Sequence, residues 1–138
     1  FGRVDEVDRA AVAQADRVYA GFWTNRGDCG DELAEVLASL ADKDVFLFGT
    51  AGFGADETYF AGVMARVAVH LPIGADRGHV HVPGPHAASV RARYAQTAEA
   101  KPEQAARMHQ LIENFDEAAS HPDDDDLARL REAVQAAS

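Results

Sequence analysis

The sequence contains a single cysteine, Cys29, so the chain cannot form an internal disulfide, and this cysteine usage is typical of a reducing cytoplasm. Long apolar runs are also missing, and none approaches the ~18 residues that a membrane span needs. The first residues lack the basic and then apolar layout of a signal peptide. We therefore expect a soluble, cytoplasmic protein.

Basic residues are few, with 13 Lys and Arg against 23 Asp and Glu, which makes the formal net charge -10. A field of that sign repels phosphate backbones and anionic lipid surfaces. The charge therefore argues against nucleic acid and membranes as partners. It is compatible with a protein partner that has a basic docking face.

Familiar catalytic fingerprints are absent as well: the chain has no G-x-S-x-G, Walker or dinucleotide-binding motif. What remains is an ordinary globular composition, with 47% hydrophobic and 26% charged residues in 138 positions. This length and composition predict one domain over residues 1–138 and exclude a disordered or multidomain chain.

The first half of the chain alternates between strand and helix patterns. Arg17–Phe22 and Asp44–Thr50 are apolar runs bounded by polar or glycine-rich turns, which predicts two strands. A helix is predicted between them from apolar positions at i, i+3, i+4 and i+7, which are Leu33, Val36, Leu37 and Leu40. Strand, helix and strand in this order predict a parallel βαβ unit.

The second half continues this pattern and then becomes helical. A helix follows the AGFGADE loop and ends before Pro72, and its apolar stripe consists of Phe60, Val63, Met64, Val67 and Leu71. Gly78–Val82 alternates at period two and predicts a third strand. After Pro85 the chain is predicted to be helical, and we expect residues 102–138 to pack on the domain as a helical tail. The fold class is α/β.

The loops after the first two predicted strands are the candidate binding site. Parallel α/β sheets bind ligands at the carboxyl ends of their strands. The loop at residues 23–30 offers an indole, an amide and a guanidinium, and the loop at 50–55 offers small residues and a phenylalanine. Two aromatic-bearing loops side by side suit a planar heterocycle. The alternative is that the glycines only permit tight turns and that Trp23 and Phe53 cap the core.

These loops carry a family resemblance. Val18–Phe60, which contains GFWTNRG and FGTAG, resembles a short-chain flavodoxin-like family in which G-F-W-T/V-x-x-G and F-G-T-x-G loops follow consecutive central strands. Leu111–Val134 also resembles the helical end of that family, with its HP-acidic turn. Some members of the family resemble the flavodoxin-like partner of a bilirubin-reducing enzyme.

The resemblance implies a doubly wound parallel sheet, FMN as the cofactor and electron transfer to a partner reductase as the function. An FMN-dependent oxidoreductase, such as a quinone or NAD(P)H reductase, shares that fold and stays open. By the resemblance, one side of the flavin ring is flanked by Trp23, Thr24, Asn25, Arg26 and Gly27. Another edge lies beside Thr50, Ala51, Gly52, Phe53 and Gly54.

The sequence departs from the family at its start. The family begins with a hydrophobic strand and a hydroxyl-rich loop that binds the FMN phosphate at a helix N-terminus, and nothing before Asp16 resembles either. We expect this chain to be an N-terminally incomplete member that binds FMN poorly unless another chain supplies that part. We also expect the strand at Arg17–Phe22 to have an exposed edge, because the absent strand is central in the family's sheet.

The second departure is GHVHVPGPHAA at Gly78–Ala88, where the family has a loop resembling G-T-F-M-C-Q-G-R/K-M-P. Permitted codons for residues 79–88 can be chosen so that translation one base later reads T-F-M-C-Q-G-R-M-P. We therefore hypothesise a compensated frameshift that ends near Ser89. Codons in the coding DNA that are incompatible with this second frame would refute the hypothesis.

The histidines in this segment suggest a metal-binding module as a competing function. His79 and His81 share one face of a strand, and His86 with Asp76 would complete a zinc or nickel site. The frameshift accounts for the same histidines without a ligand. A flavin-free interaction subunit with the same fold is the other alternative.

Two further features have simpler interpretations. Cys29 precedes a predicted helix, whose dipole would lower the pKa of a reactive thiol, but a partly buried structural cysteine is the favoured interpretation. The acids at 123–126 lack the glycine and spacing of a calcium loop. They suit the start of a charged helix with Pro122 at its first position.

Overall fold

The computed structural model describes residues 2–52, 56–85 and 87–138. Its strands are β1 (Arg17–Trp23), β2 (Asp44–Ala51) and β3 (Asp76–Pro83). Its α-helices are α1 (Arg9–Gln14), α2 (Asp31–Ala38), α3 (Glu57–Ala68), α4 (Ala88–Ala100), α5 (Ala105–Ala118) and α6 (Asp124–Ala136), and short 3₁₀ helices cover Val4–Glu6 and Pro102–Gln104. The strands and helices predicted from hydrophobic periodicity are confirmed, with small shifts at their ends.

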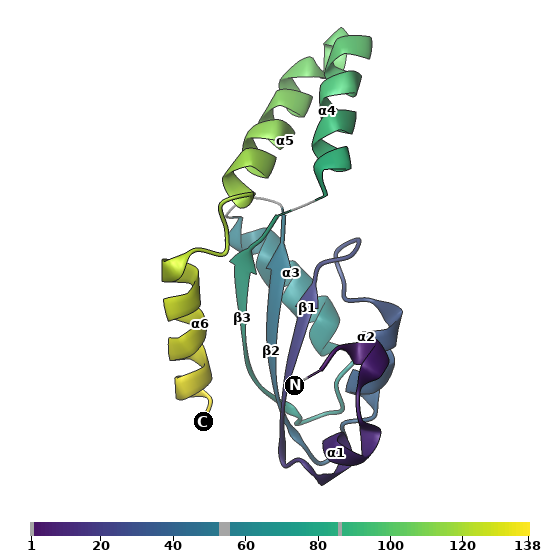
Figure 1. Cartoon of the computed structure of the whole chain (residues 1–138), viewed down its shortest axis with the longest axis vertical. Coiled ribbons are helices and arrows are strands. Elements are labelled where there is room, and N and C mark those ends of the chain that lie inside the picture. The colour runs from purple at the N-terminus through teal and green to yellow at the C-terminus, as the bar shows by residue number, and fades with distance from the viewer. Residues whose placement is uncertain (1, 53–55, 86) are drawn as a thin grey trace.

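The strands form one parallel sheet in the order β1-β2-β3 (Figure 1). Trp23 pairs with Thr50, and Thr50 in turn pairs with Val82, so the carboxyl ends of the strands lie level with one another. This arrangement follows from the βαβ sequence order, because a helix between two strands returns the chain to the start of the next strand. The α/β fold class is confirmed.

Helices α2 and α3 cover one face of the sheet. Alternate residues of the strands point to this face, and Val45 and Leu47 of β2 are fully buried there. The helices contribute the apolar stripes predicted from the sequence, with Leu37, Val63 and Val67 fully buried in the same core. Burying a side chain of this size contributes roughly 1.5–3 kcal/mol, so this face stabilises the fold.

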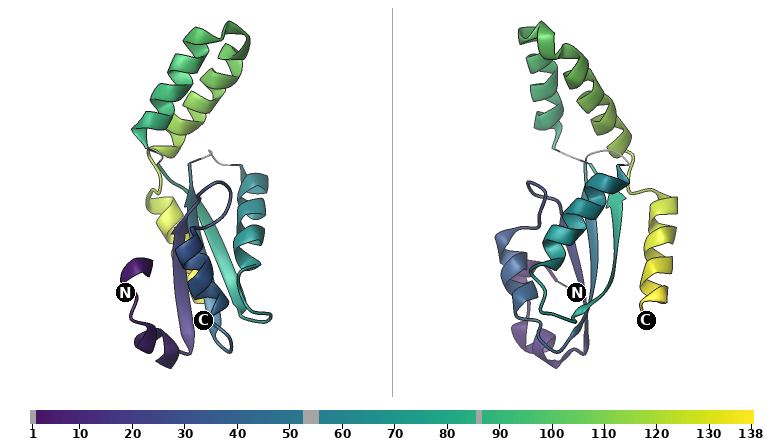
Figure 2. Two further views of the ribbon diagram at one scale, coloured as in Figure 1. Left: turned by 90° about the vertical axis from the view of Figure 1, so that its right-hand side faces the viewer. Right: turned by 180° about the vertical axis from the view of Figure 1, so that it is seen from behind.

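Helix α6 lies on the opposite face from α3, beside β3 (Figure 2). Ala137, just after α6, lies 3.7 Å from the position that a Cβ would occupy at Gly78. The helix begins at Asp124 rather than Pro122, because the side chain of Asp123 accepts a hydrogen bond from the backbone N–H of Asp126 and so acts as the N-cap. The interpretation of the acidic run as a charged helix start is confirmed.

Helices α4 and α5 form an antiparallel hairpin that projects beyond the carboxyl ends of the strands (Figures 1 and 2). Two hydrogen bonds from the Arg91 guanidinium to the Asp116 carboxylate, of 2.7 and 3.0 Å, join the two helices. Within residues 102–138, which we expected to pack on the domain as a tail, α6 contacts the sheet and α5 pairs with α4.

In the described residues, β1 pairs with β2 alone and forms an edge of the sheet. Two aromatic side chains of β1, Tyr19 and Trp23, are 47% and 72% exposed. A search of the described helices found none that combines the length and the apolar character needed to cross a membrane.

Candidate functional site

The loops after β1 and β2 meet at the carboxyl end of the sheet. The backbone N–H of Thr24 donates a 2.7 Å hydrogen bond to the carbonyl of Thr50, and the Thr24 hydroxyl donates to the same oxygen at 2.9 Å. The chain after β3 joins them, since the Gly84 N–H donates to the Ala51 carbonyl at 2.9 Å. The structure therefore places the described part of the second selected segment, residues 50–52, next to the segment that follows β1.

A tight turn shapes the first of these loops. Asn25 and Asp28 exchange two backbone hydrogen bonds, of 2.8 and 3.1 Å, around a two-residue turn. Its central residues, Arg26 and Gly27, have φ of 52° and 82°, the left-handed conformation of a type I′ turn. The Arg66 Nε of α3 donates a 2.6 Å hydrogen bond to the Gly27 carbonyl, which ties the turn to that helix.

A pocket of about 360 Å³ opens between the two loops and α3, and we call it the rim pocket. Its volume lies within the range of small-molecule sites, which is roughly 300–1,000 Å³. The described residues that line it are Thr24, Arg26, Gly27, Ala51, Gly52, Tyr59 and Arg66. Two guanidinium groups and no carboxylate are among them, so in a chain of net charge -10 this pocket is locally positive.

The residues selected from the sequence have unequal positions at this pocket. Trp23 ends β1 with a 72% exposed side chain, and it is not among the described residues that line the pocket. Thr24 is buried, and its hydroxyl already donates to Thr50, so it holds the two loops together. Phe53 and Gly54 lie outside the described residues.

Two lining residues, Tyr59 and Arg66, were missed from the sequence. They lie seven residues apart on α3, a spacing that places them on the same face of the helix. That spacing was visible in the sequence. That these two side chains line the pocket depends on how α3 packs against the loop after β1, and no local sequence pattern predicts this packing.

The helices that follow β1 and β2 both begin with acidic side chains. Asp31 and Glu32 occupy the first turn of α2, while Asp56 is the N-cap of α3 and Glu57 its first residue. Acids stabilise these helix starts through the helix dipole, but they repel a phosphate. Among the described groups lining the rim pocket, positive charge for an anion comes from Arg26 and Arg66.

The histidines of β3 lie on the side of the sheet that faces α3. His79 and His81 line a second pocket, of about 240 Å³, together with residues of α3 and α6. The His81 ring packs on Phe60 with centroids 4.0 Å apart, and its buried nitrogens have no hydrogen-bond partner in the described chain. Burial and neighbouring His79 lower the pKa of His81 to about 4, so this ring stays neutral.

The predicted metal site on β3 is not assembled by the described residues. Asp76 is at the opposite end of β3 from His81, and His86 lies outside the described chain. Three-residue groups with metal-binding geometry occur elsewhere in the described structure. They are Asp28, Cys29 and His70, and His121, Asp123 and Asp126.

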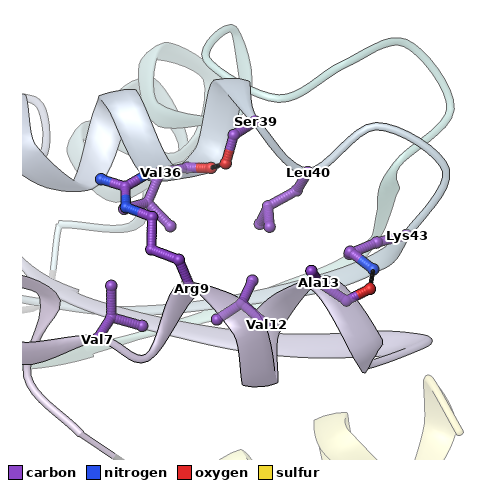
Figure 3. A pocket seen from close by; sticks show the side chains of 8 residues that line it. All are labelled: Val7, Arg9, Val12, Ala13, Val36, Ser39, Leu40 and Lys43. Atoms are coloured by element: carbon purple, nitrogen blue, oxygen red, sulfur yellow. Dashed lines mark hydrogen bonds between the residues drawn. The ribbon is translucent and has the colours of Figure 1, made fainter.

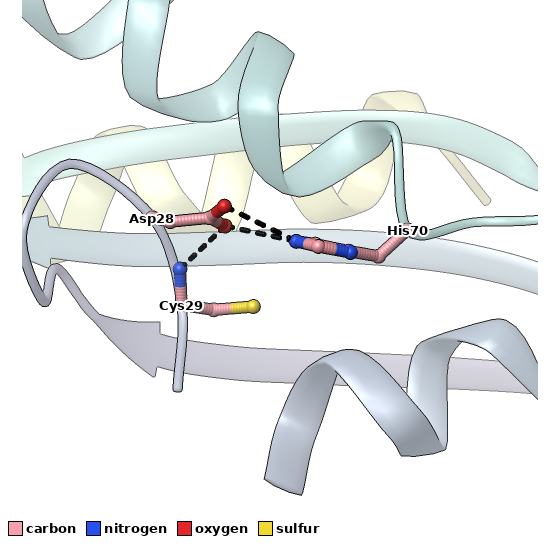
Figure 4. Close-up of side chains that lie close together, drawn as sticks. All are labelled: Asp28, Cys29 and His70. Carbon is pink, nitrogen blue, oxygen red and sulfur yellow. Dashed lines mark hydrogen bonds and ion pairs between the residues drawn. The ribbon is translucent and has the colours of Figure 1, made fainter. Parts of the chain in front are cut away.

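Cys29 is buried, as expected of a structural cysteine. Burial and the adjacent Asp28 carboxylate raise the pKa of its thiol to about 11. The alternative of a reactive thiol with a lowered pKa is therefore wrong. The fold also brings His70 close to this residue (Figure 4), although no histidine is near it in sequence.

A further hollow lies between α1 and α2 (Figure 3). It is about 90 Å³, well below the size of most ligand sites, and is lined mainly by aliphatic atoms. The Lys43 ammonium donates to the carbonyls of Ala13 and Ala15 at 2.9 and 2.7 Å. These bonds fix the end of α1, so the hollow is a packing feature of the N-terminal segment.

Sequence comparison agrees with the parallel α/β fold. A profile of the family described as the flavodoxin domain matches residues 1–135. The chain belongs to this flavodoxin-domain family. The family resemblance inferred from the loop sequences is thereby confirmed.

Two curated relatives are similar to most of this chain. The flavodoxin-like domain-containing protein BilS of Clostridium symbiosum (strain WAL-14163) is 33% identical over 124 residues, which cover 86% of this chain and 65% of the relative. The protein of the same name from Clostridioides difficile (strain CD3) is 26% identical over 113 residues, covering 81% of this chain and 64% of the relative. The chain thus spans slightly less than two thirds of the length of these relatives.

Proposed function

We propose that this chain supplies the ring-binding side of an FMN site in an electron-transfer protein. The observation that carries the proposal is the meeting of the loops after β1 and β2 at a single, locally positive pocket. Parallel α/β folds bind ligands at this end of the sheet. The flavodoxin-domain family, whose members commonly bind FMN, makes a flavin the favoured ligand.

Three features of the rim pocket and of the adjoining end of β1 suit a flat, anionic cofactor. Trp23, which precedes the lining residue Thr24, has an exposed indole that is available to contact a ring. Gly52 leaves the backbone free of a side chain that would separate it from a ring. Arg26 and Arg66 provide positive charge. FMN would supply the electron storage, and the residues of the pocket would hold it and exclude water.

Arg26 and Arg66 could pair with the phosphate of FMN or with the negative charge of its reduced ring. The acidic starts of α2 and α3 disfavour a phosphate at either helix N-terminus. We therefore assign the flavin ring to this pocket, with the arginines as the described groups that balance its charge. A comparison of FMN with riboflavin, which lacks the phosphate, separates the two roles.

The surface charge supports a basic redox partner. A chain of net charge -10 attracts a positively charged docking face and steers its approach. Electron transfer to such a partner should slow as ionic strength rises, because salt screens this attraction. A rate that does not change with salt would contradict a charge-steered partner.

The test of the flavin proposal is a titration of the folded chain with FMN and with riboflavin, followed by flavin fluorescence. We expect both ligands to bind, with affinities that differ by less than about tenfold if the ring dominates. Trp23→Ala should weaken FMN binding about fivefold, since an aromatic contact contributes about 1 kcal/mol. Tyr19→Ala is the matched control, because Tyr19 is an exposed aromatic residue of the same strand that lies four residues before its carboxyl end.

Two results would overturn the proposal. The first is a folded chain that leaves flavin fluorescence unchanged with FMN in excess, which favours a flavin-free interaction subunit of the same fold. The second is equal FMN affinity in the Trp23→Ala and wild-type chains, which places any flavin elsewhere.

A further inference from the structure

Three metal-binding side chains from distant parts of the sequence meet beside α3 (Figure 4). Asp28 and Cys29 follow the turn after β1, and His70 lies just beyond the end of α3. The His70 Nε2 lies 3.1 and 3.2 Å from the two carboxylate oxygens of Asp28. The carboxylate, thiol and imidazole ligand atoms all lie within 4.8 Å of one another.

The geometry is close to that of a tetrahedral zinc centre. With zinc–ligand bonds near 2.0 Å for nitrogen and oxygen, two such ligands on a tetrahedral centre are about 3.3 Å apart. The Asp28 and His70 atoms already have nearly that separation. The sulfur needs a spacing of about 3.6 Å from each, and because the ligand atoms lie within 4.8 Å of one another, a shift of about 1.2 Å or less would complete the set.

The surroundings allow a metal ion to enter. The side chains of His70 and Asp28 are 31% and 36% exposed, so they face solvent, while Cys29 closes the site from the core. The Cys29 backbone N–H donates a 2.7 Å hydrogen bond to Asp28 Oδ1, which orients the carboxylate. Ligands with one sulfur, one imidazole and one carboxylate favour zinc over calcium or magnesium.

We propose that Asp28, Cys29 and His70 form a three-ligand zinc site whose fourth position is taken by water. Binding breaks the S–H bond of Cys29, the sulfur bonds to zinc as a thiolate, and the proton passes to the solvent. No electron is transferred. The site would join the loop after β1 to the end of α3, next to the Arg66 bond that holds Gly27.

Cobalt(II) is the probe for this proposal, because a cobalt–thiolate bond gives a near-ultraviolet charge-transfer band. Cys29 is the one cysteine of the chain, so such a band is assigned without ambiguity. We expect the chelator-treated, full chain to develop the band with one equivalent of Co²⁺ and to lose it when Zn²⁺ is added. The titration is made without FMN, so its outcome does not depend on the flavin proposal.

Variants identify the ligands. Cys29→Ser should abolish the band, and His70→Gln and Asp28→Asn should each weaken Co²⁺ binding at least about tenfold. His109→Gln, at an exposed position of α5, is the matched control and should bind as the wild type does. Circular dichroism verifies that each variant is folded. If Cys29→Ser unfolds, the Co²⁺ affinities of His70→Gln and Asp28→Asn decide the test, because both residues are partly exposed.

Two outcomes would overturn the zinc site. One is a folded wild-type chain that shows no thiolate band with Co²⁺ in excess. The other is a band of unchanged affinity in both His70→Gln and Asp28→Asn, which would mean that Cys29 binds the metal without the other two residues.

Discussion

Two clusters of the molecule contain a histidine beside carboxylates, but they are built differently. In the first, Asp28 and His70 are 42 residues apart, and packing of α3 brings them together. In the second, His121, Asp123 and Asp126 lie within six residues at the start of α6, and we call it the α6 cap. One cluster is a product of tertiary structure, and the other is a local feature of a helix start.

The α6 cap already has a complete set of partners. Asp126 Oδ2 accepts from His121 Nδ1 at 2.5 Å and from the Asp123 N–H at 3.0 Å, while Oδ1 accepts from Arg129. A guanidinium at this position repels a cation. The described contacts of Asp28 are with His70 and the Cys29 N–H rather than with a guanidinium, so a metal ion there would not compete with a permanent cation.

Removal of the buried carboxylate should give the largest difference between the clusters. Asp126 is 1% exposed, so Asp126→Ala leaves His121 and Arg129 without their shared partner. We expect a loss of about 3 kcal/mol in the free energy of unfolding, measured with urea. Asp28→Ala should cost about 1 kcal/mol, because this carboxylate is partly solvated. Equal losses for Asp126→Ala and Asp28→Ala would contradict this difference between the two clusters. Asp125→Ala, at an exposed position, is the control and should change the free energy of unfolding by less than about 0.5 kcal/mol.

The turn at Arg26 and Gly27, which precedes Asp28 and Cys29, should be the next most sensitive feature. Gly27 has a positive φ, and a Cβ there would lie 2.9 Å from the Arg66 guanidinium. Gly27→Ala should therefore lower the free energy of unfolding by about 1–2 kcal/mol. Gly62→Ala in α3 should raise it by about 0.5–1 kcal/mol, because alanine favours a helix and meets only an atom 3.9 Å away. If Gly27→Ala and Gly62→Ala changed the free energy of unfolding in the same direction, the requirement for a positive φ at Gly27 would be contradicted.

A smaller effect should distinguish the α6 cap by its pH dependence. The hydrogen bond from His121 to Asp126 raises the pKa of His121, outweighing the opposite effect of burial, and Asp123 and Glu117 add to the rise. The unfolded-state pKa is about 6.5, so this stabilisation is fully present below that pH and is lost as the pH rises through the higher folded-state pKa.

Urea unfolding of the wild type and His121→Gln from about pH 5.5 to about pH 9 measures this contribution. The stability difference between them should shrink as the pH rises. The His109→Gln variant, at an exposed position of α5, is the control for removing a histidine. A difference for His121→Gln that does not change with pH would show that the pair with Asp126 does not involve a charged imidazole.

Much of the candidate site followed from the sequence because it depends on strand order. Apolar runs at β1 and β2 with a helix between them imply parallel neighbours, and parallel neighbours place their following loops together. Trp23, Gly27 and Gly52 could therefore be assigned to one end of the sheet. The contribution of Arg66 could not, because it depends on how α3 is inclined across the loop after β1.

The residue pattern was enough to predict the alternation of strands and helices, their buried stripes and the end of the sheet where a ligand would bind. These properties depend on periodicity and on chain connectivity, both of which are local or nearly local. Two contacts follow instead from the packing of the folded chain: the Thr24 hydroxyl donates to the Thr50 carbonyl, and His70 lies close to Cys29. Those contacts depend on how helices and strands far apart in the chain pack against one another. The side chains of the whole core fix that packing jointly, so no local pattern predicts it.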